Sequence, residues 1–180
     1  MFQEVQQSLK FKMKIERKFL IKEKEKIYPC PFPVEGLKKE IKSKGEKITQ
    51  HYLPKEFSKE IFETLGFKTN FQTDKFRIRK YGKKYFITMK SSGKIKRHEK
   101  ENRISKEIFE VLEKLKIKTL EKTRLIKNYK NKKIEFNYFP KHSLITAEIE
   151  FRSLSESKKF KTNMKEISGS KEYQNSVLTE

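Results

Sequence analysis

Alternating apolar and polar residues predict that most of this chain is β-structure. In the segment FKMKIERKFLIK (residues 11–22), Lys14, Glu16 and Lys18 fall on one face of an extended strand and the apolar residues fall on the other. The same alternation predicts further strands over residues 46–54, as short hairpins within 74–102, and over 121–129, 132–139 and 144–151. Turns at Tyr81-Gly82 and at residues 91–93 separate the hairpin strands.

Helical periodicity is confined to short segments between these strands. Apolar residues three and four apart, with capping residues at the ends, predict helices over 33–45 (ended by Gly45), 58–67 (capped by Ser58, ended near Gly66) and 105–116 (capped by Ser105). The end of the segment 166–178 is a further candidate helix.

The order of these elements predicts an α+β fold with a closed or nearly closed antiparallel sheet. No internal repeat and no linker divides the chain. We therefore expect an N-terminal extension over residues 1–12 and a single domain over residues 13–180.

The charge of the chain has two interpretations. A net charge of +21 suggests a polyanionic partner such as nucleic acid, polyphosphate or a nucleotide. However, 38 Lys stand against 7 Arg and one Ala, which is what an AT-rich coding bias would produce. The charge alone therefore does not establish nucleic-acid binding, and each arginine is more informative than each lysine.

Cysteine content and hydropathy favour a cytoplasmic protein. Cys30 is the single cysteine, so no disulfide framework is available and a reducing compartment is expected. The sequence has no apolar run of 18 residues and no apolar signal core at its N-terminus.

Seven of the predicted strand segments carry a polar pair or triplet on one face. These sets are Lys14/Glu16/Lys18, Arg77/Arg79, Thr88/Lys90, Arg97/Glu99/Glu101, Lys122/Arg124, Glu135/Asn137 and Glu148/Glu150. The wet outer face of a one-sided sheet would alternate in the same way. Two details favour a charged interior instead. Two of the seven arginines form Arg-x-Arg, and glutamate recurs as Glu-x-Glu at 99/101 and 148/150. Basic and acidic clusters also occupy separate strands, as binding of an anion together with a metal requires. A barrel of about eight strands has a lumen suited to one small ligand.

These motifs, in this order, resemble the CYTH superfamily of triphosphate tunnel metalloenzymes. The resemblance rests on KIERKFL (14–20), ITQHYL (48–53), FRIRK (76–80), YFITMK (85–90), RHEKE (97–101), KTR (122–124), IEFNYF (134–139), LITAEIEF (144–151) and the closing segment 166–178. It covers nearly the whole chain, from about Met13 to Leu178. The family includes inorganic triphosphatases, thiamine triphosphatases and class IV adenylate cyclases.

The resemblance implies a closed eight-stranded antiparallel β-barrel, with helices packed outside, that binds a triphosphate moiety lengthwise. It implies that the phosphate oxygens are held by Lys18, Arg77, Arg79, Lys90, Lys122 and Arg124. It implies Mg²⁺ or Mn²⁺ held by Glu16, Glu148 and Glu150, and a catalytic group of Glu99, Glu101 and Lys90, in which the two glutamates hold a second metal or orient water. The expected function is metal-dependent hydrolysis of inorganic triphosphate or a triphosphate ester. The expected partner is a triphosphate-containing small molecule, with a homodimer as the assembly considered and no specific nucleic acid or membrane.

Two positions depart from the family pattern, and they keep other functions open. Lys14 stands where the first glutamate of the signature is expected, and Asn137 where an aspartate is expected. A protonated ammonium cannot ligate Mg²⁺ and could take the place of the metal electrostatically. The alternatives are a catalytically impaired tunnel that binds triphosphate or polyphosphate, an enzyme like a class IV adenylate cyclase, and nonspecific nucleic-acid binding by the basic exterior.

Histidine and phenylalanine patterns favour structural roles. His51, His98 and His142 are scattered without metal-ligand spacing, so surface or packing roles are predicted for them. The phenylalanines of the segment 57–71 are spaced for helix packing rather than for base stacking.

Overall fold

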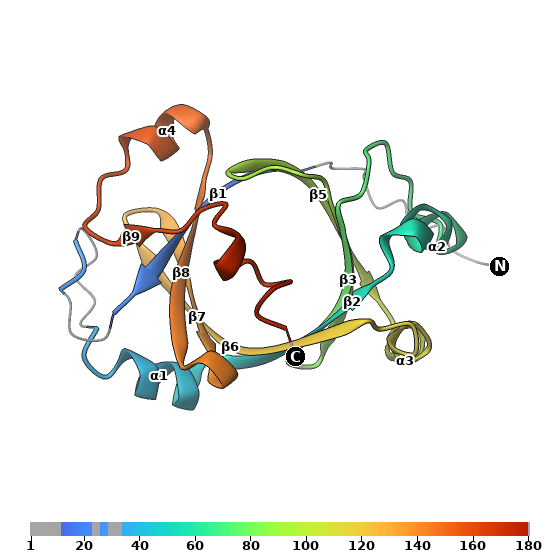
Figure 1. Ribbon diagram of the computed structural model, residues 1–180, viewed down its shortest axis with the longest axis horizontal. Helices are drawn as coiled ribbons and strands as arrows, with labels where there is room; N and C mark the ends of the chain where they lie inside the picture. Colours follow the sequence, from blue (N-terminus) through green and yellow to red (C-terminus); the bar gives the residue numbers. More distant parts are fainter. Residues whose placement is uncertain (1–11, 23–25, 29–33, 180) are drawn as a thin grey trace.

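The computed structural model describes residues 12–22, 26–28 and 34–179, and within them the chain forms a closed antiparallel barrel (Figure 1). Nine strands are paired in the order β5-β4-β3-β2-β6-β7-β8-β1-β9, and pairing between β5 and β1 closes the ring of the first eight. The predicted α+β fold with a closed eight-stranded barrel is confirmed. Cys30 and nearly all of the predicted N-terminal extension lie outside the described residues.

The elements follow the predicted segments closely. The strands are β1 (Lys12–Ile21), β2 (Glu46–Leu53), β3 (Lys75–Tyr81), β4 (Lys84–Lys90), β5 (Lys96–Ile104), β6 (Lys118–Tyr129), β7 (Lys132–Phe139), β8 (Leu144–Phe151) and β9 (Lys165–Glu166). The helices are α1 (Leu37–Lys44), α2 (Ser58–Thr64), α3 (Lys106–Glu113) and α4 (Leu154–Lys159), with short 3-10 turns η1 (Lys55–Phe57), η2 (Pro140–His142) and η3 (Lys171–Tyr173).

The register of the strands places the charged faces of neighbouring strands on the same side of the sheet, all the way around the ring. Directly paired residues of an antiparallel ladder point to the same side. On this basis Lys18 pairs with Glu148, Glu148 with Glu135, and Arg77 with Thr88. The polar sets of the seven segments therefore all face the lumen, which decides between the two interpretations of the alternation.

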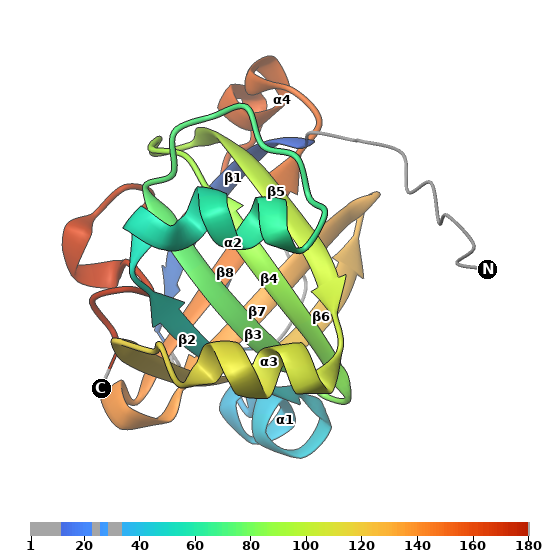
Figure 2. The ribbon, with the colours of Figure 1, turned by 90° about the vertical axis from the view of Figure 1, so that its right-hand side faces the viewer.

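Helices and loops lie on the outside of the barrel (Figures 1 and 2). They cover the apolar faces of the strands there. One buried cluster joins α1 to β1, β7 and β8 and includes Phe19, Leu37 and Ile41. A second joins α2 and α3 to β3 and β4 and includes Phe62 and Phe109. Burial of apolar surface thus stabilises the barrel from its outside, which leaves the lumen free for charge.

The C-terminal segment crosses the barrel opening in the view of Figure 1. Strand β9 pairs with β1 at Phe19 and Leu20, beyond the short stretch where β1 pairs with β5. Leu178 then packs against Leu120 and Phe139, which form a small apolar cluster inside one end of the barrel. This segment therefore lies across that end of the lumen and packs against its wall.

Several local predictions need correction. Ser58 does not cap α2, because η1 runs directly into this helix and Phe57 stands at its N-cap without a side-chain hydrogen bond. Helix α4 was not predicted, although its Ser153 hydroxyl accepts a hydrogen bond from the Glu156 amide at 3.0 Å. The segment 166–178 begins with the last residue of β9 and contains the 3-10 turn η3 in place of the candidate helix at its end.

Other predictions agree with the fold. Ser105 caps α3 by accepting from the Ile108 amide at 3.3 Å. Gly45 ends α1 in a tight turn, where an added Cβ would lie 2.4 Å from the Ile41 carbonyl oxygen. Among the described residues, no helix is long and apolar enough to cross a membrane.

Candidate functional site

The lumen of the barrel is a charged tunnel. It contains a cavity of about 710 Å³, which adjoins a second of about 330 Å³ beside the C-terminal segment and shares Glu16, Arg77 and Glu148 with it. Among the described residues, twelve cationic side chains and seven carboxylates line the two cavities, an excess of five positive charges. The cationic residues are Lys14, Lys18, Lys75, Arg77, Arg79, Lys90, Lys94, Arg97, Lys122, Arg124, Lys133 and Lys171, and the acidic ones are Glu16, Asp74, Glu99, Glu101, Glu135, Glu148 and Glu150.

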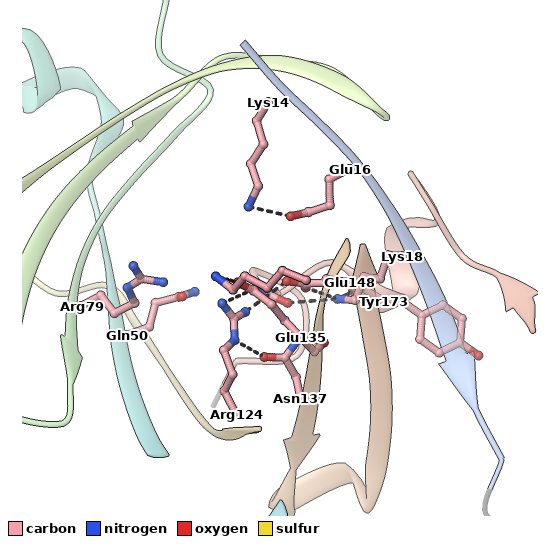
Figure 3. A network of polar contacts seen from close by, with 12 residues as sticks. Lys14, Glu16, Lys18, Gln50, Arg79, Arg124, Glu135, Asn137, Glu148 and Tyr173 are labelled. Carbon is pink, nitrogen blue, oxygen red and sulfur yellow. Dashed lines mark hydrogen bonds and ion pairs between the residues drawn. The ribbon is translucent and has the colours of Figure 1, made fainter. Parts of the chain in front are cut away.

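Glu16 lies between two cations at the β1–β5 seam. The Lys14 Nζ is 2.6 Å from one carboxylate oxygen of Glu16 (Figure 3). The Arg97 Nη2 is 3.0 Å from the other oxygen. Burial acts to raise the pKa of Glu16, but Lys14 and then Arg97 outweigh it and hold this pKa at about 2. Burial acts to lower the pKa of Lys14, and the surrounding carboxylates, Glu16 first, raise it above its usual range. Both groups are therefore charged at neutral pH.

Arg124 is the centre of a second network, on β6, β7 and β8 (Figure 3). Its Nη2 donates to Glu148 at 3.1 Å, its Nε donates to the Asn137 Oδ1 at 2.7 Å, and its Nη1 is ion-paired with Glu135. Burial acts to raise the pKa of Glu148, but Lys122, Arg124 and Lys18 lower it well below its usual range. The guanidinium thus satisfies three acceptors that the strand register brings to one point.

The arginines of β3 are held by neighbours on both sides. Arg77 donates to the Gln50 Oε1 at 2.7 Å, and the Gln50 Nε2 donates to the Tyr52 hydroxyl at 2.7 Å. Arg79 donates to Glu101 at 2.8 Å, and the Thr88 hydroxyl donates to the other oxygen of that carboxylate at 2.8 Å. These contacts fix the direction of both guanidinium groups before any ligand arrives.

Lys90 and Glu99 form an ion pair inside the tunnel. The Lys90 Nζ is 3.1 Å from the Glu99 Oε2. Burial, and then the positive charge of Arg77, lower the pKa of Lys90 to about 7 despite this partner. Burial acts to raise the pKa of Glu99, but Lys90 and Lys14 lower it below its usual range. The lysine can therefore change protonation state near neutral pH, whereas the glutamate stays ionised.

Lys122 and Lys18 face the same phenyl ring from within the lumen. Their Nζ atoms lie 5.6 and 5.5 Å, respectively, from the centre of the Phe139 ring. Within the described part of the chain, the Lys122 ammonium makes no hydrogen bond or ion pair, and Lys122 is 3% exposed. Burial, and then Arg124, lower its pKa well below the usual range. Lys18 donates to the Tyr173 carbonyl at 2.8 Å and to the Asn175 Oδ1 at 3.1 Å, so it also joins β1 to the C-terminal segment.

The residues predicted to hold a metal are a poor fit to one. Within the described residues, no three His, Cys, Asp or Glu side chains come together as a cation-binding group. Glu16 is already paired with Lys14 and Arg97, and Glu148 with Arg124 and Lys18. Divalent cations need several carboxylate or carbonyl oxygens turned to one point, and these oxygens are turned to ammonium and guanidinium groups instead.

Every predicted phosphate-binding, metal-binding and catalytic residue lines the tunnel. Residues in or beside the tunnel that received no predicted role include Gln50, Tyr52, Thr88, Arg97 and Glu135. The polar faces Thr88/Lys90, Arg97/Glu99/Glu101 and Glu135/Asn137 were the available signal for three of them. The strand ITQHYL mixes polar and aromatic residues and gave no comparable signal for Gln50 and Tyr52.

The histidines lie outside the tunnel and have structural contacts, as predicted. The His51 Nδ1 is 2.9 Å from the Thr119 hydroxyl, beneath α3. His98 stacks on Phe71 with ring centres 5.7 Å apart. The His142 Nε2 is 3.2 Å from the Leu178 carbonyl oxygen, which ties the C-terminus to η2.

Comparison with solved structures places the fold among known barrels. The inorganic triphosphatase NE1496 matches with a TM-score of 0.50 and 24% identity over 92% of this chain and 93% of that one. A candidate adenylate cyclase from Bacillus halodurans matches with a TM-score of 0.50 and 16% identity over 81% and 84% of the two chains. One from Vibrio parahaemolyticus matches with a TM-score of 0.50 and 12% identity over 82% and 80%. No protein-family model and no curated protein matches the sequence. The resemblance to the triphosphate tunnel family is thus confirmed at the level of the fold.

Proposed function

We propose that this chain is a triphosphate tunnel protein and that its lumen binds a linear triphosphate, either inorganic or as the end of a triphosphate ester. The observation that carries the proposal is the buried Lys122 ammonium, which has no anionic partner in hydrogen-bonding contact within the described residues. A buried cation without a partner destabilises a fold and persists where a ligand compensates it. Because cationic side chains outnumber carboxylates in the lumen, we expect that ligand to be an anion.

The arrangement of the cations favours a chain of phosphates over a single one. Lys75, Arg77 and Arg79 follow one another on β3 at alternate positions, so their Cα atoms are spaced by roughly 6.6 Å. Lys122 and Arg124 repeat this spacing on β6, which β2 separates from β3 in the ring. A rod-like anion can contact both rows along its length, whereas orthophosphate can occupy only one level of the tunnel.

Hydrolysis of a phosphoanhydride is the second candidate function, and the pair of Lys90 and Glu99 favours it. A water that attacks the terminal phosphorus would release orthophosphate and leave pyrophosphate, or a diphosphate ester, whose leaving oxygen can accept a proton from Lys90. The resemblance to inorganic triphosphatases supports turnover. Against it, the carboxylates that would orient water are already bonded to Arg79, Thr88 and Lys90. We therefore place binding first and hydrolysis second.

The test compares anions by isothermal titration calorimetry, with phosphate release measured on the same samples. We expect tripolyphosphate to bind with a stoichiometry of one and more tightly than pyrophosphate or orthophosphate. Competition between ATP and tripolyphosphate would show that the site also binds triphosphate esters. Equal and weak affinity for all three inorganic anions, with a steep dependence on salt, would overturn the proposal and favour nonspecific binding by the basic exterior.

Three expectations from the sequence stay predictions. They are turnover that depends on Mg²⁺ or Mn²⁺, assembly as a homodimer, and a cytoplasmic location. An activity like that of an adenylate cyclase needs a base-recognising pocket, and the sequence pattern does not identify one.

A further inference from the structure

We infer that Lys14 supplies the positive charge that a divalent cation would otherwise bring to this tunnel, so that the ligand enters as a metal-free triphosphate anion. The inference rests on the proposed function and names the ionic form of the ligand. It starts from the position of one side chain at the β1–β5 seam.

Lys14 points into the lumen from β1 and lies among acidic groups (Figure 3). Its Nζ is 2.6 Å from Glu16, and the negative charges that act on it are those of Glu16, Glu99, Glu135 and Glu148. These four carboxylates come from four different strands, β1, β5, β7 and β8, which the barrel brings around one ammonium. These strands are consecutive in the ring, in the order β5-β1-β8-β7, and a cation held among their carboxylates has the electrostatic environment of a bound metal.

Other cations already hold two of these carboxylates, Glu16 and Glu148. Arg97 holds the second oxygen of Glu16 at 3.0 Å, and Arg124 holds Glu148 at 3.1 Å. A divalent cation at this point would need oxygens that are already turned to these groups, and it would meet the fixed charge of Lys14. Glu16 and Glu148, two of the residues predicted to hold a metal, therefore have cationic partners without one.

The charge of the lumen leads to the same result. With every lysine and arginine counted as protonated, Lys14 included, the lining carries a formal excess of five positive charges, which attracts an uncomplexed triphosphate. Complexation with Mg²⁺ removes two negative charges from the ligand and therefore weakens its attraction to this lining. Substitution of Lys14 reduces the excess and leaves the surrounding carboxylates to repel the ligand, unless a divalent cation compensates them.

The experiment measures tripolyphosphate affinity by calorimetry in EDTA and again with excess Mg²⁺ or Mn²⁺. Wild-type protein is expected to bind in EDTA and to bind no more tightly when metal is added. Lys14→Gln is expected to weaken binding in EDTA by about tenfold or more, with partial recovery in Mn²⁺. Lys14→Glu is expected to weaken it further and to bind Mn²⁺ directly, as followed by the electron paramagnetic resonance signal of free Mn²⁺.

The matched control is Lys106→Gln, which removes a lysine that pairs with Glu110 at 3.2 Å on the outer surface of α3. It should leave both affinities unchanged, and thermal unfolding checks that every variant is folded. Binding by wild-type protein that requires Mg²⁺ or Mn²⁺ would overturn this inference and leave the proposed function intact. Absence of binding under all conditions would overturn the proposed function, and the inference with it.

Discussion

Lys122 and Phe139 face each other inside the tunnel, with the ammonium 5.6 Å from the centre of the phenyl ring. The ring compensates only part of a buried charge, because a cation–π contact contributes about 0.5–2 kcal/mol. The same ring faces Lys18, which also contacts Glu148, Tyr173 and Asn175, whereas Lys122 makes no hydrogen bond or ion pair within the described residues. The tunnel therefore holds more positive charge near Phe139 than its own groups neutralise, which is a property expected of an anion site.

Replacement of Lys122 should improve stability and impair binding. Lys122→Met removes a buried charge and keeps an unbranched side chain against Phe139. We expect the free energy of unfolding to rise by about 1 kcal/mol or more and tripolyphosphate affinity to fall at least about tenfold. Urea unfolding and calorimetry measure the two effects, with Lys106→Met on the outer surface as the control. Lower stability with unchanged affinity would assign Lys122 a packing role instead.

The low pKa of Lys90 predicts how binding depends on pH. Free Lys90 loses its proton near pH 7, and a bound polyanion raises this pKa. Above about pH 7, binding must therefore take up a proton, and affinity should fall by up to about tenfold per pH unit. Calorimetry at pH 8 in buffers of different ionisation enthalpy measures this proton uptake. Lys90→Arg, which stays protonated, should reduce the uptake; an unchanged uptake would exclude Lys90 as its source.

The same pKa predicts a trend in stability without ligand. Unfolded Lys90 keeps its proton up to its ordinary pKa of 10.5, whereas folded Lys90 loses it near 7. Between these values the unfolded state binds more protons, so the contribution of Lys90 to stability rises with pH, and below pH 7 the full cost of burying the charged ammonium applies. Urea unfolding at pH 6 and pH 9 should show a smaller rise with pH for Lys90→Met than for wild-type protein. An equal rise in both would contradict the prediction.

Among the residues that line the tunnel, Arg124 should contribute most to the stability of the barrel. Arg124→Met leaves Glu135 and Glu148 buried without their guanidinium, and Asn137 without its donor. We expect a loss of about 3–5 kcal/mol in the free energy of unfolding, measured with urea at pH 7. The control Arg152→Met changes an exposed arginine and should shift it by less than about 0.5 kcal/mol. Similar values for the two variants would contradict the central role of Arg124.

Gln50 should act by positioning Arg77. Gln50→Leu removes the acceptor at 2.7 Å and leaves the guanidinium free to turn. We expect tripolyphosphate affinity to fall by about tenfold, while affinity for orthophosphate, which needs only one level of the tunnel, changes less. Tyr52→Phe removes only the hydroxyl that supports Gln50 and should have a smaller effect. Equal losses for both anions would indicate a general structural defect.

The order and type of the main elements were accessible from sequence because they depend on local periodicity. Strands β7 and β8 have the predicted bounds, and Ser105 and Gly45 mark the ends of helices as their chemistry suggests. Helix α4 was missed because its polar sequence carries almost no apolar periodicity, although Ser153 caps it. The C-terminal segment was expected to be partly helical, but its structure depends on contacts with Lys18 and with the apolar residues at one end of the barrel.

The sequence by itself determined which residues share a face of each strand, because side chains alternate with a period of two whatever the strand pairs with. The alternation therefore shows which residues make up the charged face, including Lys14 at the position where a glutamate is expected. Only the tertiary structure decided that this face is the inside of a closed ring, that Arg97 and Lys14 take both oxygens of Glu16, and that Lys122 has no ion pair within the described residues. These relationships join strands far apart in the chain, so they depend on barrel closure and register, which local periodicity does not contain.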